Sequence, residues 1–377
     1  MSRIRLLLYA AAFALLALLS SAAPAHPATG IVVDASGRIH FSDLETVWRL
    51  EPSGRLTVFR PAVSGRHVHE LSIDNDNNLY GGDVTYESAT GRWVEAVWRR
   101  APDGREETYL VAPTTDPPRG VTVWRDAAGN TYSVQQDNNL KRETLILKRT
   151  PRGEVLTLAG GAYGHADGRG ARARFRSIGG MAFGPDGSLY VTDAGDLRRV
   201  DADGEVRTLA TRLEETMPDD TLTGYGGLMG LAVDAGGNAY VADYGRRRVW
   251  KVAADGKVSR VVRSDAPWSP TGVATTRDGR VLVLETGFTP PNIYNGPRVR
   301  ELARDGTLKV LATVGLKQNV AARLTSSRAA DVNAPTEKYE SKDGLLERAL
   351  SLYFGLGVVA ICAVAGLKGF ARRSGHA

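Results

Sequence analysis

The chain of 377 residues contains a single cysteine, Cys362. No disulfide can form within the chain, so a folded domain must be held together by its hydrophobic core alone. Cys362 lies inside a C-terminal apolar segment, which leaves the rest of the chain without cysteine. Between the N-terminal apolar run and a polar stretch at 316–346, about 290 residues remain, enough to build one large core.

Several chemical signatures are also missing. The net charge of +6 is modest, and the sequence has no basic cluster with interleaved aromatic residues, which argues against nucleic acid as a partner. We find no Ser–His–Asp grouping, no phosphate-binding loop and no cofactor fingerprint. The sequence therefore predicts no cofactor, and only calcium and zinc need to be weighed as metals.

Residues 1–25 have the form of a secretory signal peptide. Two arginines precede an uncharged apolar run from Leu6 to Leu19, and small residues follow it. The run is short for a membrane span, so we expect export, with cleavage after Ala22 or Ala25. An uncleaved anchor is the alternative.

A second apolar segment, Ala349 to Leu367, has 19 residues and no charge. That length can cross a hydrocarbon core of roughly 30 Å. Basic residues follow in the tail 368–377, so the positive-inside rule predicts a cytoplasmic tail and an extracytoplasmic (periplasmic or extracellular) main domain. The polar stretch 316–346 would then be a linker to the membrane. A buried C-terminal helix is the alternative.

What the sequence does contain is a repeat of about fifty residues. Each copy has an apolar strand, a tight turn, a second strand ending in a polar residue, a third strand, a short turn ending in glycine, and a fourth strand. Successive turn glycines are 49–52 residues apart, at Gly54, Gly104, Gly153, Gly204, Gly256 and Gly306.

Short alternating strands with glycine turns predict an all-β array. Four strands per copy and six copies predict a six-bladed β-propeller over residues 29–315, because a four-stranded blade cannot bury both of its faces alone. Trp48, Trp98 and Trp250 recur at one place in the third strand. We expect these tryptophans to pack between blades.

Two stretches carry a family resemblance. YVADYGRRRVWKV and the longer segment from Leu158 to Gly195 resemble the NHL repeat of bacterial proteins. Gluconolactonase-like and strictosidine synthase-like propellers share the six-bladed architecture, so the resemblance implies the fold more than any one function.

The insertions in this pattern are expected on one face of the propeller. First-to-second and third-to-fourth turns are short, whereas second-to-third loops and blade connections are long. We call the latter side the loop-rich face. Long loops on a rigid scaffold commonly carry function, and these loops are at 84–92, 136–144, 160–177, 212–227 and 286–297.

The stretch HVHEL, residues 67–71, begins the inner strand of the second blade. Five copies carry glycine there, and Glu70 occupies the sixth place. On a regular strand His67 and His69 share one face and Glu70 points to the other. We predict ligand-binding residues near the channel mouth from the inner-strand starts and the two second strands that do not end in aspartate: His69, Glu70, Arg119, Thr29, Thr271, Gln135 and Glu285.

These residues favour a sensor or docking module over an enzyme. A mouth with Glu70 and Arg119 suits a protein, a peptide end or a small polar ligand, and Tyr86, Tyr225 and Tyr294 on the long loops add aromatic contact area. The resemblance to gluconolactonase-like propellers implies an alternative, a metal-dependent lactone hydrolase with Glu70 on a divalent cation. Zinc needs three or four ligands. His67 and His69 could be two of them, and the third would have to be Glu70, which points to the other face of a regular strand, or an acid from a loop.

Overall fold

The computed structural model describes residues 28–63, 65–87, 92–111, 122–136, 143–223, 226–289 and 293–315. Apart from Glu87 and Arg92, these residues belong to one compact unit. The predicted signal peptide, linker, membrane span and tail lie outside them. Within the described ranges, no helix is long and apolar enough to span a membrane.

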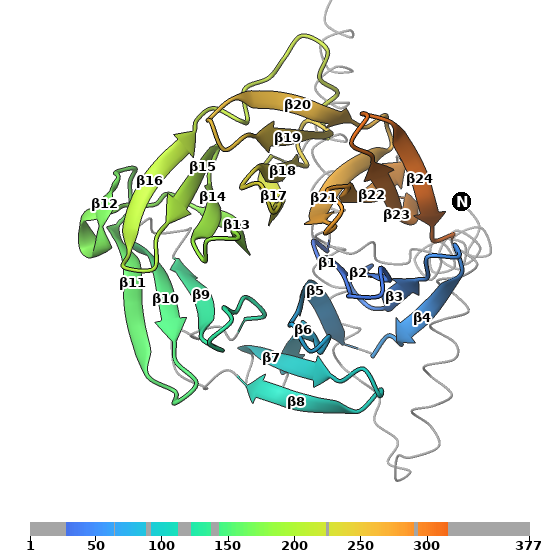
Figure 1. Ribbon diagram of the computed structural model, residues 1–377, viewed down its shortest axis with the longest axis horizontal. Helices are drawn as coiled ribbons and strands as arrows, with labels where there is room; N and C mark the ends of the chain where they lie inside the picture. Colours follow the sequence, from blue (N-terminus) through green and yellow to red (C-terminus); the bar gives the residue numbers. More distant parts are fainter. Residues whose placement is uncertain are drawn as a thin grey trace, which may run out of the picture. The chain divides into compact units, whose positions relative to one another are not determined.

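The described chain is all-β and forms a six-bladed propeller (Figure 1), which confirms the predicted fold class. Blade 1 contains β1 (Ile31–Val33), β2 (Ile39–Ser42), β3 (Val47–Leu50) and β4 (Leu56–Arg60). Blade 2 contains β5 (Arg66–Ile73), β6 (Leu79–Glu87), β7 (Arg92–Arg100) and β8 (Glu106–Val111). Blade 3 contains β9 (Thr131–Gln136), β10 (Glu143–Arg149) and β11 (Val155–Ala162).

The second half of the ring follows the same plan. Blade 4 contains β13 (Ile178–Phe183), β14 (Leu189–Asp193), β15 (Asp196–Val200) and β16 (Glu205–Ala210). Blade 5 contains β17 (Leu228–Val233), β18 (Ala239–Asp243), β19 (Arg248–Val252) and β20 (Val258–Arg263). Blade 6 contains β21 (Trp268–Thr275), β22 (Val281–Thr289), β23 (Ile293–Leu302) and β24 (Leu308–Thr313).

Two blades depart from four strands. Blade 3 has three strands in the part of the chain that the structure describes. Blade 4 has five, because β12 (Gly168–Arg169) from the connection 160–177 pairs with β16. The added strand covers hydrogen-bonding groups that the outer edge of a sheet would otherwise expose. A 3₁₀ turn, η1 (Gly170–Arg172), follows it.

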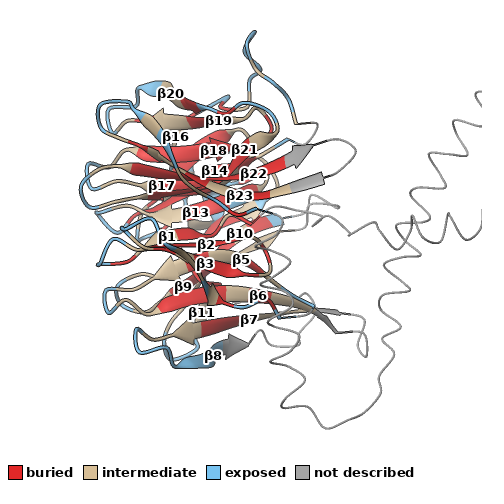
Figure 2. Cartoon of the chain, turned by 90° about the vertical axis from the view of Figure 1, so that its right-hand side faces the viewer, coloured by how far each residue is buried: buried red, intermediate tan, exposed pale blue. Residues whose placement is uncertain are grey.

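Two of the predicted long loops are shorter than expected, because strands extend into them. The described residues 84–87, 92, 286–289 and 293–297 belong to strands, since β6 runs to Glu87, β7 starts at Arg92, β22 runs to Thr289 and β23 starts at Ile293. The insertions therefore lengthen the strands of blades 2 and 6 on the loop-rich face. The opposite face carries the tight turns, which are among the exposed segments in Figure 2.

The inner strands begin with glycine because neighbouring backbones touch there. A Cβ on Gly230 would lie 2.5 Å from the Cα of Gly272, and one on Gly272 would lie 2.3 Å from the carbonyl oxygen of Thr29. Neither distance leaves room for a side chain. These contacts join blades 5, 6 and 1. They explain why glycine recurs at the start of the inner strands, which the sequence repeat shows but does not explain.

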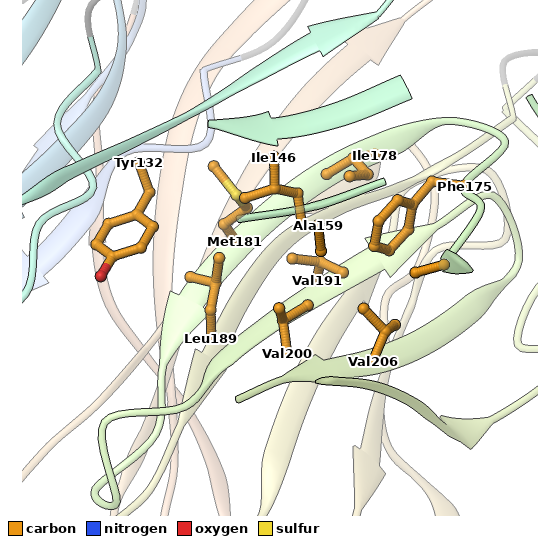
Figure 3. Packing of buried hydrophobic residues seen from close by; sticks show 11 residues of the cluster. Tyr132, Ile146, Ala159, Phe175, Ile178, Met181, Leu189, Val191, Val200 and Val206 are labelled. Atoms are coloured by element: carbon orange, nitrogen blue, oxygen red, sulfur yellow. The ribbon is translucent and has the colours of Figure 1, made fainter. Parts of the chain in front are cut away.

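The core lies between blades. In one cluster Tyr132 and Ile146 of blade 3 pack against Met181, Leu189 and Val191 of blade 4 (Figure 3). The expected packing role of the recurrent tryptophans is confirmed for the two most buried ones. Trp48 and Trp98 are 4% and 3% exposed and belong to such clusters, whereas Trp250 is partly buried against a third cluster.

The ring closes without exchange of strands between the described ends of the chain. Strands β1–β4 and β21–β24 form separate sheets of consecutive strands. Blade 1 contributes Phe41 and Trp48, and blade 6 contributes Leu284 and Val299, to a shared buried cluster. Closure therefore depends on hydrophobic packing and on the close approach of β21 to β1.

Candidate functional site

A β-bulge in β5 decides where the side chains of the HVHEL stretch point. Val68 pairs with Asp83 and Leu71 pairs with Gly81, so the two residues between them, His69 and Glu70, oppose one residue of β6. A bulge of this kind re-aims side chains that would alternate on a regular strand. His69 and Glu70 both line one cavity, which corrects the expectation that they face opposite sides.

The cavity has a volume of about 460 Å³ and lies between blades 2, 3 and 4. Its walls come from strand ends on the loop-rich face. Blade 2 provides His69, Glu70 and Glu95, and other blades provide polar groups from Thr122, Ser133, Gln136 and the Ile178–Gly180 segment. The volume is in the range that small-molecule sites occupy.

Two carboxylates give this cavity its charge. Glu70 and Glu95 are both half-buried in its wall. Burial, reinforced by the negative charge of Glu95, raises the pKa of Glu70 to about 7. Burial also raises the pKa of Glu95. A raised pKa signals a carboxylate that has left water without gaining a compensating charge.

Among the described lining residues, none is a lysine or an arginine. The third acid of the wall, Asp83, is already neutralised. Its carboxylate accepts two hydrogen bonds from Arg60, at 2.9 and 2.8 Å, and one from the indole of Trp98 at 3.0 Å. The cavity therefore presents Glu70 and Glu95 as its available negative charges.

The ionisation of Glu70 has a consequence for stability that can be measured. With an ordinary pKa of 4.5 in the unfolded chain and about 7 in the folded one, the native state keeps a proton that the unfolded state has lost. Stability therefore falls as pH rises from about 4.5 to about 7. We expect Glu70→Gln to stabilise the protein at about pH 8, by up to roughly 2 kcal/mol, and to have little effect near pH 4.

Chemical denaturation of both proteins at several pH values tests this expectation. Glu107→Gln is the control, because Glu107 is an exposed acid of the same blade. A stability difference between Glu70→Gln and the parent that does not change with pH would show that Glu70 titrates normally.

The other predicted site residues do not all lie at the cavity. Thr29 lies beside His69, with its Oγ1 3.4 Å from the His69 carbonyl oxygen. Thr271 is fully buried and donates to the carbonyl of Leu284 at 3.4 Å. Gln135 donates to Glu143 at an exposed position. Neither Thr271 nor Gln135 is a lining residue of the cavity, and Arg119 lies outside the described residues.

Glu285 has a structural role. It is fully buried, and its carboxylate binds Arg298, Arg300 at 3.1 Å and the hydroxyl of Ser264. With its charge matched and its oxygens occupied, Glu285 is corrected from a ligand-binding candidate to a structural residue. The acids that end other second strands behave alike: Asp193 binds Arg198, and Asp243 binds Arg248, both at 2.9 Å.

Sequence inspection missed Glu95 and Gln136. A signal for Glu95 exists, since it lies two residues before Val97 on β7, and Val97 is fully buried beside Val123. Residues two apart share a face of a strand, so Glu95 faces the same buried side. Gln136 is adjacent to the predicted Gln135 and accepts from the backbone N–H of Ile178 at 3.0 Å.

The metal implied by the gluconolactonase-like resemblance does not fit the described donors. No group of three or more His, Cys, Asp or Glu side chains converges among the residues that the structure covers. Calcium takes six to eight oxygen ligands, and the cavity provides two unpaired carboxylates. We derive no metal-dependent step for this site.

Comparison with known proteins gives only distant similarities. No protein-family model matches the sequence, and no curated protein matches it. Among solved structures, a gluconolactonase from Xanthomonas campestris is 16% identical, with 75% of this chain and 87% of that one covered and a TM-score of 0.48. A luciferin-regenerating enzyme is 17% identical, with 79% and 97% covered and a TM-score of 0.47.

A virginiamycin B lyase from Staphylococcus aureus, solved with quinupristin, is 16% identical, with 77% and 85% of the two chains covered and a TM-score of 0.43. The three proteins carry different activities, so this likeness extends to the fold alone.

Proposed function

We propose that this propeller is a binding module whose cavity between blades 2, 3 and 4 takes the ammonium group of a small ligand or of a peptide. The observation that carries the proposal is the pair Glu70 and Glu95, two half-buried carboxylates that share one cavity with no cationic lining residue in the described chain. Buried charges are normally paired, so a cationic ligand would complete the site.

The remaining walls suit an organic amine. Ser133, Thr122 and Gln136 supply hydrogen-bonding groups, and Trp124 supplies an aromatic surface, which attracts a cation through its ring. From the sequence, we expect a peptide end or a small polar ligand at a mouth with Glu70 and Arg119. A cationic ligand is proposed instead because a second carboxylate, Glu95, lines the same cavity.

The proposed setting is outside the cytoplasm. Residues 1–25 would direct export, and 349–367 would hold the propeller to the membrane through the linker 316–346, with a cytoplasmic tail. In that arrangement the module would report or dock a ligand at the membrane surface. Protease accessibility of the propeller in cells stripped of their outer layers tests it, and full protection would contradict it.

Ligand affinity should depend on pH through Glu70. With a pKa of about 7, the ionised fraction of Glu70 rises from roughly 3% near pH 5.5 to roughly 90% near pH 8. If only the ionised form binds a cation, the apparent affinity rises about 30-fold over that range. Isothermal titration with putrescine, a diamine, measures this change, and butanediol is the uncharged control.

Two variants distinguish the effect of the Glu70 charge on binding from the effect of the cavity volume. Glu70→Gln should remove the pH dependence and most of the affinity. Gly82→Val should close the cavity at every pH, since a Cβ on Gly82 would point at Glu70 Oε2 and Val123 Cγ1 from 3.8 and 3.9 Å, ordinary contact distances that the fold tolerates. The proposal would be refuted if the affinity for putrescine did not change with pH and was the same in the parent and in both variants.

Catalysis in the same cavity is the second candidate, favoured by the pKa of Glu70. A general base works best with a pKa near the working pH, and the bulge places His69 beside Glu70. A lactone hydrolysis assay with the parent and Glu70→Gln, with and without added calcium or zinc, decides this point. Turnover that Glu70→Gln loses would make the site catalytic, and absence of turnover would leave the binding role alone.

A further inference from the structure

A second pocket lies on the opposite face, that of the tight turns. It has a volume of about 540 Å³ and is formed by blades 5 and 6. Its walls come from β18, β19 and β20, from the first-to-second turns of both blades, and from the third-to-fourth turn of blade 6. It shares no residue with the cavity around Glu70.

Three cationic side chains line this pocket. They are Lys251 on β19, Arg277 in the first turn of blade 6 and Arg304 in its last turn. Among the described residues, none of the three is ion-paired with an acid within 4.0 Å. The nearby acids Asp278 and Glu301 instead bind Arg280.

The only acid in the described lining is Asp234, and its oxygens are already used. They accept hydrogen bonds from the backbone of Gly236 and Asn238, from the Asn238 amide at 2.8 Å and from the Tyr240 hydroxyl at 3.2 Å. Three positive charges against one negative charge leave the pocket with a formal excess of two.

Arg304 is held in place by the turn beside it. A Cβ on Gly279 would lie 2.7 Å from Arg304 Nε and 2.9 Å from Nη2, so the guanidinium lies directly on the turn backbone. Gly279 has a φ of +81°, a conformation that glycine adopts without strain. The turn that carries Arg277 therefore also contacts the guanidinium of Arg304, and both cations lie at one corner of blade 6.

The junction of blades 5 and 6 differs from two other blade junctions in the side chain beside the second-strand tyrosine. Blade 3 places Arg125 over Tyr80 of blade 2, 3.7 Å from the ring centroid, and blade 4 places Phe183 against Tyr132 at 5.1 Å. The equivalent position in blade 6 is Thr275, which is much smaller and bonds the carbonyl of Val233. Tyr240, which occupies the place of Tyr80, lies in the wall of the pocket.

We propose that this pocket binds a small molecule that carries a phosphate group. Arginine guanidinium groups match phosphate oxygens in geometry and bind them through charge-assisted hydrogen bonds. A phosphate monoester carries a charge of about −1.5 to −2 near neutral pH, which balances the excess in the pocket. Tyr240, Val281 and Leu302 provide apolar contact for the organic part of the ligand.

Titration calorimetry with phenyl phosphate at low ionic strength tests this proposal on the full-length chain. We expect saturable binding that Arg277→Gln combined with Arg304→Gln weakens at least about tenfold. Benzoate, which has the same ring and a single charge, should bind more weakly. Because the sites are separate, Glu70→Gln should leave phenyl phosphate binding unchanged.

The matched control is Arg55→Gln combined with Arg152→Gln. Both arginines are exposed in third-to-fourth turns of other blades, so this variant loses the same charge from the same face. Absence of saturable binding, equal binding of benzoate, or an equal loss in the control variant would each overturn the proposal, the last because it would show attraction to overall charge and not to the pocket.

Discussion

Replacing Arg248 by alanine should lower the free energy of unfolding by about 3–5 kcal/mol, because two buried carboxylates would lose their nearest counter-ion. Arg248 is fully buried. Its guanidinium binds Asp243 at 2.9 Å and Asp220 at 2.7 Å, and both carboxylates are at most 1% exposed. Removal of the arginine leaves negative charge in a place that water barely reaches.

The same side chain holds the connection between blades 4 and 5. Its Nη2 also donates to the carbonyl oxygens of Leu213 at 3.0 Å and Glu215 at 2.6 Å. The Glu215 carbonyl would lose this donor as well, and buried groups without partners are costly. The Leu213 carbonyl would keep the indole N–H of Trp250 at 2.8 Å. Thermal unfolding should show a fall in the melting temperature of roughly 10 °C or more.

Arg260→Ala is the matched control. Arg260 binds Asp219 in the same connection at 2.7 Å, and both side chains are partly exposed. Its distance to the buried Asp220 is 3.9 Å, against 2.7 Å for Arg248. Surface ion pairs contribute about 0–1 kcal/mol, so this variant should be close to the parent. Similar losses for Arg248→Ala and Arg260→Ala would show that burial is not what gives Arg248 its importance.

Replacing Gly272 by valine should destabilise the protein by about 3 kcal/mol or more, because the added side chain would collide with backbone. A Cβ there would lie 2.3 Å from the carbonyl oxygen of Thr29, 3.0 Å from its carbon and 3.1 Å from Ile31 Cγ2. Thr29 cannot move away freely, since its N–H and that of Gly30 both donate to the carbonyl of His69. The strain therefore falls on the junction that closes the ring.

Thermal unfolding and limited proteolysis of Gly272→Val measure this effect, and Gly272→Ala supplies a milder variant if the valine protein does not fold. Gly226→Ala is the control, because a Cβ on Gly226 meets no atom within 4 Å. A melting temperature for Gly272→Ala equal to that of Gly226→Ala would mean that blades 6 and 1 can separate without cost.

The fold was largely predictable because its signals are local. Turn glycines such as Gly104 and Gly204 have positive φ values of 90° and 81°, and a regular spacing of such residues with alternating strands between them specifies a blade. Six copies then require a closed ring, since each blade must bury its faces against its neighbours. The lengths of the hairpins in blades 2 and 6 were not predictable, because residues that resemble a loop can pair once a partner strand is beside them.

The candidate site was predicted only in part. The departure from glycine at Glu70 was visible in the repeat, and the structure places it in a cavity wall. The role of Glu285 was not predictable, because its partners Arg298 and Arg300 become neighbours only when β22 and β23 pair. Glu95 was missed for a related reason: the burial of Val97, which marks this face of β7, comes from packing against Val123, a residue distant in the chain.

By itself, the sequence determined the number of blades, their strand order and the position of Glu70 at the start of an inner strand. These features follow from turn geometry and period-two alternation, which depend on residues close together in the chain. Tertiary structure alone decided which side chains meet. The bulge that places His69 and Glu70 in the wall of one cavity, and the cationic pocket formed by blades 5 and 6, depend on contacts between strands and blades far apart in the chain. Such contacts are set by packing, which no short stretch of sequence records.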